Sequence, residues 1–196
     1  IGHPLKSGAL FEGREDIFKF LIENLAGSVQ DRTFVLHGQR RTGKTSILYQ
    51  LANGRLGANF VPVLIDMQEL ALDVNHTGDL LSEIAYQLAR AARKAGVAIE
   101  EPDEARFEKA PTRTFNRFLD ALEDSLGERH VVIMLDEFEL IEGKITEGKV
   151  DANIAGYQLK WIPDIKRSNY VVDLEYKKGM PYNEILLIAM KREEKA

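Results

Sequence analysis

A run of residues near the start of the chain has the residue types of a phosphate-binding loop. Gly38-Gln39-Arg40-Arg41-Thr42-Gly43-Lys44-Thr45 fits the pattern G-x-x-x-x-G-K-[ST] at every position. The glycines permit backbone conformations and a close approach that a side chain would block, so successive amides can face phosphate oxygens. The lysine is expected at the β- and γ-phosphates, the threonine at a magnesium ion, and Ser46, the next residue, near the α-phosphate. The alternative is a glycine-rich turn with a solvated lysine.

Two adjacent carboxylates form the second half of this expected site. Asp136 and Glu137 directly follow the apolar run Val131–Leu135. A carboxylate at the end of a buried strand loses hydration, and a nearby cation compensates for that loss. Asp136 is therefore the expected magnesium ligand together with Thr45, directly or through water. Glu137, which acts with Lys44 in catalysis, is the expected base that deprotonates a water for attack on the γ-phosphorus. The alternative is that a polar turn simply ends the strand.

The elements around these residues predict an α/β fold. Thr33–His37 is typical of a short strand, and the helical pattern Thr45–Leu51 follows the loop. Phe60–Ile65 and Val131–Leu135 are apolar throughout, which indicates parallel strands covered by helices on both faces. Strands that alternate with helices predict right-handed crossovers, and ligands of such sheets bind at the carboxyl ends of the strands. Both polar signals lie at that edge.

Three amphipathic patterns predict the covering helices. They lie at Gly13–Leu25, at Asp79–Ala95, and over a segment whose apolar positions run from Phe115 to Leu126. A glycine follows each pattern and is the expected stop, namely Gly27, Gly96 and Gly127. The acidic stretch Glu100–Pro111 is expected to be a solvated connection.

The composition is that of one soluble domain. The chain has 196 residues, of which 44% are hydrophobic and 29% charged. It has no cysteine, which excludes disulfides and zinc sites built on cysteine, and its four histidines are not at metal-ligand spacing. The formal net charge of −5 does not favour a nucleic-acid-coating surface, although it leaves a local basic patch open. No apolar run approaches the roughly 20 residues that cross a bilayer, so we expect a cytoplasmic protein without membrane insertion. The start, Ile1-Gly2-His3-Pro4, has neither Met nor a signal pattern, and is expected to be internal to a longer protein.

Several of these segments together resemble a known family. The segment Phe11-Glu12-Gly13-Arg14-Glu15, the loop Gly38–Ser46, the strand that ends in Asp66, and Leu135-Asp136-Glu137-Phe138-Glu139 are similar to the core of the signal-transduction ATPases with numerous domains. These proteins (STAND ATPases) are relatives of the AAA-type ATPases. The resemblance extends from about residue 10 to 157.

The resemblance implies a fold and an activity. The fold would be a P-loop NTPase three-layer sandwich with a mainly parallel sheet, truncated after the strand Val131–Leu135, which corresponds to the Walker B strand of the family. Residues 1–157 would form the ATPase core. The activity would be ATP binding with slow, magnesium-dependent hydrolysis, coupled to conformational switching of attached sensor or effector domains. The family also places the Gly-Arg-Glu segment near the adenine, which puts Phe11, Gly13 and Arg14 beside the base.

Residues 158–196 diverge from the family and are expected to form a C-terminal extension on the core. Beyond about Tyr157 no sensor strand or helical lid is matched. Tyr170–Tyr176 predicts a fourth strand, and Pro181 is expected to open a last helix through Met190. Because the sensor and lid are unmatched, a non-hydrolysing nucleotide-dependent switch is the alternative to an ATPase.

The extension also carries a second, more permissive pattern. Pro163-Asp164 and Glu175-Tyr176-Lys177 fit the P-D…(D/E)-x-K signature of restriction-type nucleases, whose carboxylates hold a divalent metal. The extension is too short for a nuclease core, so a nuclease remnant is a weaker alternative than an ordinary strand flanked by charges.

Overall fold

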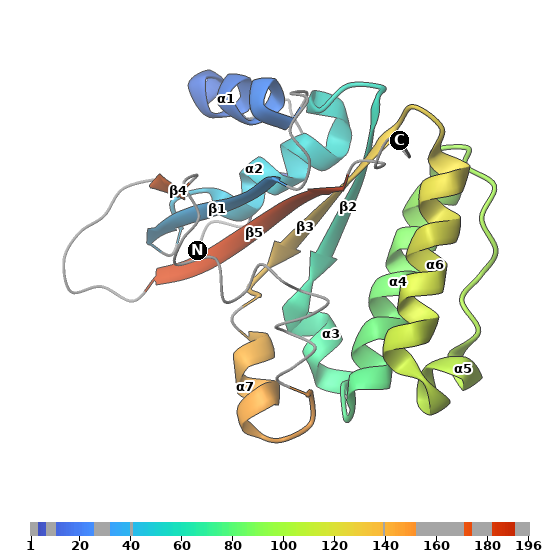
Figure 1. The fold of residues 1–196 in the computed structure, drawn as a ribbon. Coiled ribbons are helices and arrows are strands. Elements are labelled where there is room, and N and C mark those ends of the chain that lie inside the picture. The colour runs from blue at the N-terminus through green and yellow to red at the C-terminus, as the bar shows by residue number, and fades with distance from the viewer. Residues whose placement is uncertain are drawn as a thin grey trace.

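The computed structural model of the chain describes residues 4–6, 11–25, 32–39, 41–138, 140–151, 171–173 and 182–190. For 171–173 and 182–190, and for most of 32–39, it describes the backbone and not the side chains. The described residues form a mixed α/β fold in which helices cover both faces of a central sheet (Figure 1).

The sheet has five described strands in the spatial order β2-β3-β5-β1-β4. Their bounds are Arg32–Gln39 for β1, Phe60–Asp66 for β2, His130–Asp136 for β3, Val171–Asp173 for β4 and Tyr182–Met190 for β5. β2 is parallel to β3 and β4 is parallel to β1, whereas β5 is antiparallel to both β1 and β3. Because β5 opposes both neighbours, β1 and β3 run in the same direction. Their carboxyl ends therefore meet at one edge of the sheet, as the sequence predicted.

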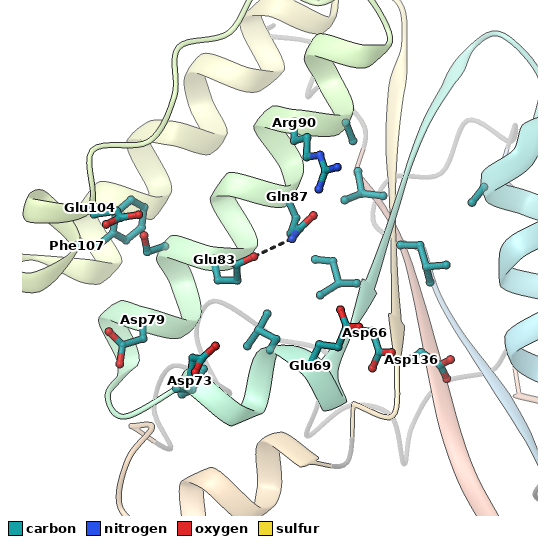
Figure 2. Close-up of a pocket in the computed structure, with 18 of the residues that line it drawn as sticks. Asp66, Glu69, Asp73, Asp79, Glu83, Gln87, Arg90, Glu104, Phe107 and Asp136 are labelled. Carbon is teal, nitrogen blue, oxygen red and sulfur yellow. Dashed lines mark hydrogen bonds between the residues drawn. The ribbon is translucent and has the colours of Figure 1, made fainter.

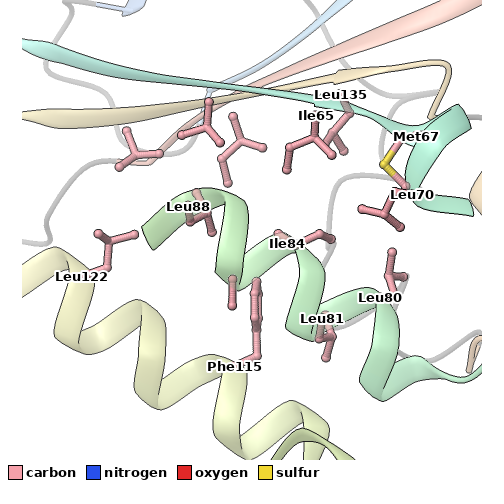
Figure 3. Packing of buried hydrophobic residues seen from close by; sticks show 14 of the residues in the cluster. Ile65, Met67, Leu70, Leu80, Leu81, Ile84, Leu88, Phe115, Leu122 and Leu135 are labelled. Carbon is pink, nitrogen blue, oxygen red and sulfur yellow. The ribbon is translucent and has the colours of Figure 1, made fainter. Parts of the chain in front are cut away.

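One face of the sheet is covered by α4 (Thr77–Lys94) and α6 (Pro111–Leu126). A hydrophobic cluster fills the space between these helices and the sheet. Its buried residues include alternate positions of β2 and β3 and the apolar stripe of α4 (Figure 3). In Figure 3, Ile84 and Leu88 of α4 lie below Ile65 and Leu135 of the sheet. The predicted stop at Gly96 follows α4 directly, and its φ of +78° is a conformation that glycine adopts most readily.

The opposite face is covered by α1 (Glu15–Leu25) and by α2 (Lys44–Gln50), which continues into η2 (Leu51–Arg55), a kinked turn whose backbone is not helical at Asn53 and Gly54. The predicted apolar stripe of α1 is buried against this face. Val132 and Met134 of β3 belong to this second cluster, whereas their neighbours Val131 and Ile133 belong to the first. A strand buried on both faces has no polar side, which explains why its sequence is apolar throughout.

Three short helices were not predicted from the sequence. They are α3 (Met67–Asp73), α5 (Glu104–Lys109) and α7 (Leu140–Thr146). The expected solvated connection Glu100–Pro111 is wrong over α5, because Asp103 caps that helix and Phe107 is only 1% exposed. A helix of one or two turns is too short to show a hydrophobic period, so the cap was the available signal. Among the described residues, no helix combines the length and apolar character needed to cross a bilayer.

The extension contributes strands to the sheet. The predicted strand at Tyr170–Tyr176 is present over the described residues 171–173 as β4. The predicted helix from Pro181 to Met190 is wrong, since residues 182–190 form β5 between β1 and β3. A short apolar run such as Ile185–Met190 has no period that separates a buried helix from a buried strand. The sheet decides between the two, because the position between β1 and β3 can be occupied only by a strand that pairs with both.

Candidate functional site

The predicted loop starts inside β1 rather than after it. β1 continues two residues beyond the predicted end at His37, so Gly38 and Gln39 are paired with β5. Arg40 lies outside the described residues. The turn that remains between β1 and α2 therefore runs from residue 40 to residue 43.

This turn has a backbone suited to binding an anion. Arg41 and Gly43 both have positive φ, of 68° and 90°, with Thr42 between them. Left-handed residues within a turn are typical of concavities in which backbone N–H groups converge. A Cβ added at Gly43 would meet no atom within 4 Å, so the left-handed φ, and not lack of space, is what favours glycine there.

The helix that follows the turn begins with polar side chains held inside the fold. Gly43 provides no side-chain cap to α2, and the first turn of α2 has no acidic residue. Lys44 is 6% exposed and Ser46 is 7% exposed. A buried ammonium needs hydrogen bonds or opposite charge, and Lys44 is among the residues that have an interaction partner in the structure. The first turn thus presents a lysine and uncapped backbone N–H groups at the carboxyl edge of the sheet.

Thr45 and Asp136 lie close together across the two halves of the site. The Thr45 hydroxyl is near enough to the Asp136 carboxyl group to lower its pKa through hydrogen bonding, although one residue lies on α2 and the other ends β3. Burial raises the pKa of Asp136 above its usual value, the Thr45 hydrogen bond lowers it, and the negative charges of Glu137 and Asp66 raise it further. Asp136 is thus a partly buried carboxylate that lacks full compensation for its charge.

Glu137 follows Asp136 in a strained turn. Its φ is 53°, in the left-handed region that a non-glycine residue rarely adopts. Its carbonyl oxygen accepts a hydrogen bond from the Leu140 amide at 3.1 Å, which closes the turn between β3 and α7. Glu137 is half-buried and has an interaction partner in the structure. The turn therefore takes Glu137 out of the line of the strand, one position beyond Asp136.

The segment before α1 reaches the loop through one arginine. Nη2 of Arg14 donates to the carbonyl oxygen of Thr42 at 3.4 Å. Gly13 and Arg14 both have positive φ, of 84° and 64°, and the Arg14 carbonyl accepts the first amides of α1. Phe11 packs edge-on against Phe18 with ring centroids 5.7 Å apart. Arg14 therefore touches the predicted loop, whereas Phe11 is held against α1.

A second N-terminal segment lies along α2, which sequence reasoning did not find. The amide of Leu5 donates to Ser46 Oγ at 2.9 Å, and the carbonyl oxygen of Leu5 accepts from Gln50 Nε2 at 3.0 Å. The Lys6 carbonyl accepts from Asn53 Nδ2 at 2.6 Å. Three polar side chains about one turn apart on α2 and η2 thus bind a passing backbone. The sequence shows the polar stripe of Ser46, Gln50 and Asn53, but not its partner, because that segment is distant in the chain.

The volume beside these residues opens along β2 rather than over the loop. A cavity of about 1040 Å³ is lined by β2, by α3 and α4, and by Tyr49, Ala52 and Asn53 from α2 and η2 (Figure 2). Of the predicted site residues, Asp136 alone lines it. Asp66 and Asp136 lie next to each other at its margin, as Figure 2 shows. The cavity meets the expected phosphate site only at these carboxylates.

The described residues contain no group of three or more His, Cys, Asp or Glu side chains that would hold a metal by themselves. A magnesium ion held through one hydroxyl, one carboxylate and nucleotide phosphates does not require such a group. Thr45 and Asp136 are hard oxygen donors in contact with each other, and so fit that chemistry. The nuclease-type residues Asp164, Glu175 and Lys177 lie outside the described residues.

The family resemblance has no independent support from wider comparison. Neither protein-family models, nor curated proteins, nor solved structures yield a match to this chain. The functional reading accordingly depends on the residues of the site.

Proposed function

We propose that the chain is a nucleotide-binding P-loop domain that binds Mg-ATP at the β1–α2 turn. The observation that carries the proposal is the closeness of the Thr45 hydroxyl to the Asp136 carboxyl group, which lowers the pKa of Asp136. In the proposed arrangement these are the two protein groups on the magnesium ion, and the fold supplies them from separate elements. The left-handed turn before α2 and the buried Lys44 support the same location for the phosphates.

The proposed roles follow from the chemistry of each side chain. Lys44 binds the β- and γ-phosphates as a fixed positive charge, and backbone amides of the turn between β1 and α2 surround them. Magnesium, when bound with the nucleotide, supplies positive charge to the phosphates. Glu137 orients and deprotonates the attacking water. Arg14, whose guanidinium contacts the loop at Thr42, and Phe11 are proposed to lie on the adenine side.

A lysine variant tests nucleotide binding. Lys44→Ala should weaken Mg-ATP binding about 10- to 100-fold, because it removes charge-assisted hydrogen bonds. Isothermal titration with Mg-ATP measures this, and circular dichroism checks the fold. Lys109→Ala, which changes an exposed lysine at the end of α5, is the matched control and should bind as the unmodified chain does. Unchanged affinity in a folded Lys44→Ala variant defeats the proposal.

A threonine variant tests the metal contact. Thr45→Val keeps the shape of the side chain but removes the hydroxyl, whereas Thr45→Ser keeps the hydroxyl. The gain in ATP affinity on adding magnesium should disappear in the first variant and persist in the second. An equal magnesium response in both variants would remove Thr45 from the metal site.

A non-hydrolysing switch is the second candidate function, and the direction of β5 favours it. The family that the sequence resembles carries a sensor residue at the carboxyl end of a later strand. Here β5 is antiparallel to β1 and β3, and so brings its amino end, Tyr182–Glu184, level with the end of β1. If ATP binds without phosphate release, this alternative is the function, and attached sensor or effector domains would respond to binding alone.

A further inference from the structure

β2 is an edge strand with backbone groups turned away from the sheet. Within the described sheet β2 pairs with β3 alone. The Asn59 carbonyl faces β3, because it accepts the His130 amide at 2.9 Å, whereas the next amide, that of Phe60, donates to Gly57 at 3.3 Å. In a parallel strand the backbone groups of successive residues point alternately toward and away from the neighbouring strand. The N–H and carbonyl groups of the even-numbered residues of β2 therefore point away from β3.

The proline in β2 agrees with this alternation. Pro62 has no N–H, and a proline is accepted in an edge strand where its missing N–H would point away from the neighbour. Between the end residues Phe60 and Asp66, the outward groups are thus the Pro62 carbonyl and both the N–H and the carbonyl of Leu64. No hydrogen bond from another described residue reaches them outside the β2–β3 ladder. This edge offers one donor and two acceptors to an added strand.

The cavity along this edge has walls on both sides. α4 contributes Glu83, Gln87 and Arg90, which point toward β2 in Figure 2, and α2 with η2 contributes the other wall. Its volume of about 1040 Å³ is at the upper end of the roughly 300–1,000 Å³ of ligand pockets. A groove of this size along an open strand edge accommodates an extended chain whose alternate side chains enter the two walls.

The charge of the groove selects the kind of chain. Besides Asp136, the groove is lined on the side of β2, α3 and the start of α4 by the carboxylates of Asp66, Glu69, Asp73 and Glu83. None of the four forms an ion pair within the described part of the chain. Two cationic residues, Arg90 and Lys94, line the groove from farther along α4. A ligand that carries a positive side chain at every second residue complements the acidic part of the groove, which is the larger part.

We propose that the open edge of β2 binds an extended segment of a partner protein, rich in lysine or arginine, as an added β-strand. Main-chain hydrogen bonds to Pro62 and Leu64 hold the segment, and the carboxylates of α3 and α4 select its charge. This site is separate from the proposed nucleotide site, although Asp136 lies at the boundary of both. A partner strand would therefore be bound directly beside the proposed magnesium-binding carboxylate.

Fluorescence anisotropy with defined peptides tests the proposal without nucleotide. The probe is a labelled octapeptide of alternating Lys and Val with blocked ends, compared with its Glu/Val counterpart and with a Lys/Val peptide N-methylated at every residue. The Lys/Val peptide should bind, and the other two should bind at least about tenfold more weakly, since one has the wrong charge and the other has no N–H group to donate on either edge. Equal binding of all three overturns the proposal.

Protein variants separate the groove from general attraction. The double variant Glu69→Gln/Glu83→Gln should weaken the Lys/Val peptide about fivefold, whereas Asp120→Asn/Glu128→Gln, on exposed residues of α6 and the following turn, should not. Leu64→Pro removes the outward N–H and should weaken binding in a folded protein. The proposal is overturned if neither the groove double variant nor Leu64→Pro weakens peptide binding. It is also overturned if the chain self-associates and Leu64→Pro abolishes that self-association, because the edge would then bind a second copy of the chain. Lys44→Ala should bind the peptide normally, so failure of nucleotide binding is measured separately.

Discussion

Asp66 and Asp136 are in-register partners on the neighbouring parallel strands β2 and β3. They have the same residue type at the same position of successive strands, but different hydrogen bonds. Asp66 accepts the Gln68 amide at 2.9 Å and caps α3, while Asp136 lies beside the Thr45 hydroxyl, which lowers its pKa. The difference follows from position: β2 is at the edge and leads into a helix, whereas β3 is inside the sheet beside α2. The negative charge of Asp66 also raises the pKa of Asp136.

Replacing Asp136 should stabilise the protein at neutral pH. Its pKa is raised above 3.8 by burial and by its acidic neighbours. Over the pH range between 3.8 and the raised value, the native state binds the proton more tightly than the unfolded state, so the free energy of unfolding falls as pH rises. Asp136→Asn should therefore be more stable than the unmodified chain at pH 7, with the difference vanishing below the ordinary aspartate pKa.

Urea unfolding as a function of pH measures this effect. Asp120→Asn, on the exposed side of α6, provides the control and should leave the pH dependence unchanged. The same Asp136→Asn variant should lose the magnesium-dependent part of ATP affinity, which shows the functional cost of the stabilisation. A variant less stable than the unmodified chain at pH 7 would contradict the electrostatic account of Asp136.

Glu137→Gln should separate hydrolysis from binding. Glutamine retains the size of the side chain but cannot take a proton, so phosphate release should fall about 100- to 10,000-fold while ATP affinity stays within about twofold. Release of inorganic phosphate under saturating Mg-ATP is the measurement, with Glu128→Gln as the matched exposed control. Full turnover by Glu137→Gln would exclude this residue as the base. Absence of turnover in the unmodified chain would favour the switch.

Gln50 should contribute measurably to stability through the N-terminal segment. Its side chain is 2% exposed and donates to the Leu5 carbonyl at 3.0 Å. Gln50→Ala should cost about 1–3 kcal/mol of unfolding free energy, because a buried side chain loses both its packing and its hydrogen bond. Asn53→Ala removes an exposed donor to Lys6 on the same segment and should cost less than about 1 kcal/mol. Equal losses in urea unfolding would show that burial of the Gln50 contact is not decisive.

Gly78 is required by a close approach of two helices. A Cβ at this position in α4 would lie 2.8 Å from the carbonyl oxygen of Phe107 in α5. Gly78→Ala should destabilise the protein by about 1–3 kcal/mol, because backbone must shift to relieve the overlap. Gly143→Ala in α7 is the opposite case: no atom lies within 4 Å and its helix propensity improves by about 1 kcal/mol. Thermal unfolding should therefore move in opposite directions for the two variants, and a shared direction would contradict the steric argument.

The residue types of the candidate site could be recognised in the sequence because they depend on neighbours along the chain. The residue types of the loop Gly38–Thr45 and the apolar run before Asp136 are properties of consecutive residues. The helices α1, α4 and α6 were predictable because each is long enough to show a hydrophobic period, and their predicted stripes are buried. The same reasoning missed α3 and α5, whose few turns show only a capping aspartate.

Contacts between distant segments were decided by the tertiary structure. The hydrogen bonds of Leu5 to α2 join residues whose sequence carries no mark of each other. The direction and place of β5 were set by the gap between β1 and β3, since an apolar run alone does not distinguish a strand from a buried helix. The sequence alone thus indicated that Thr45 and Asp136 have the chemistry of a magnesium site. Their contact arose only when β1 and β3 were aligned in one direction within the sheet, because packing and strand pairing act between residues far apart in the chain.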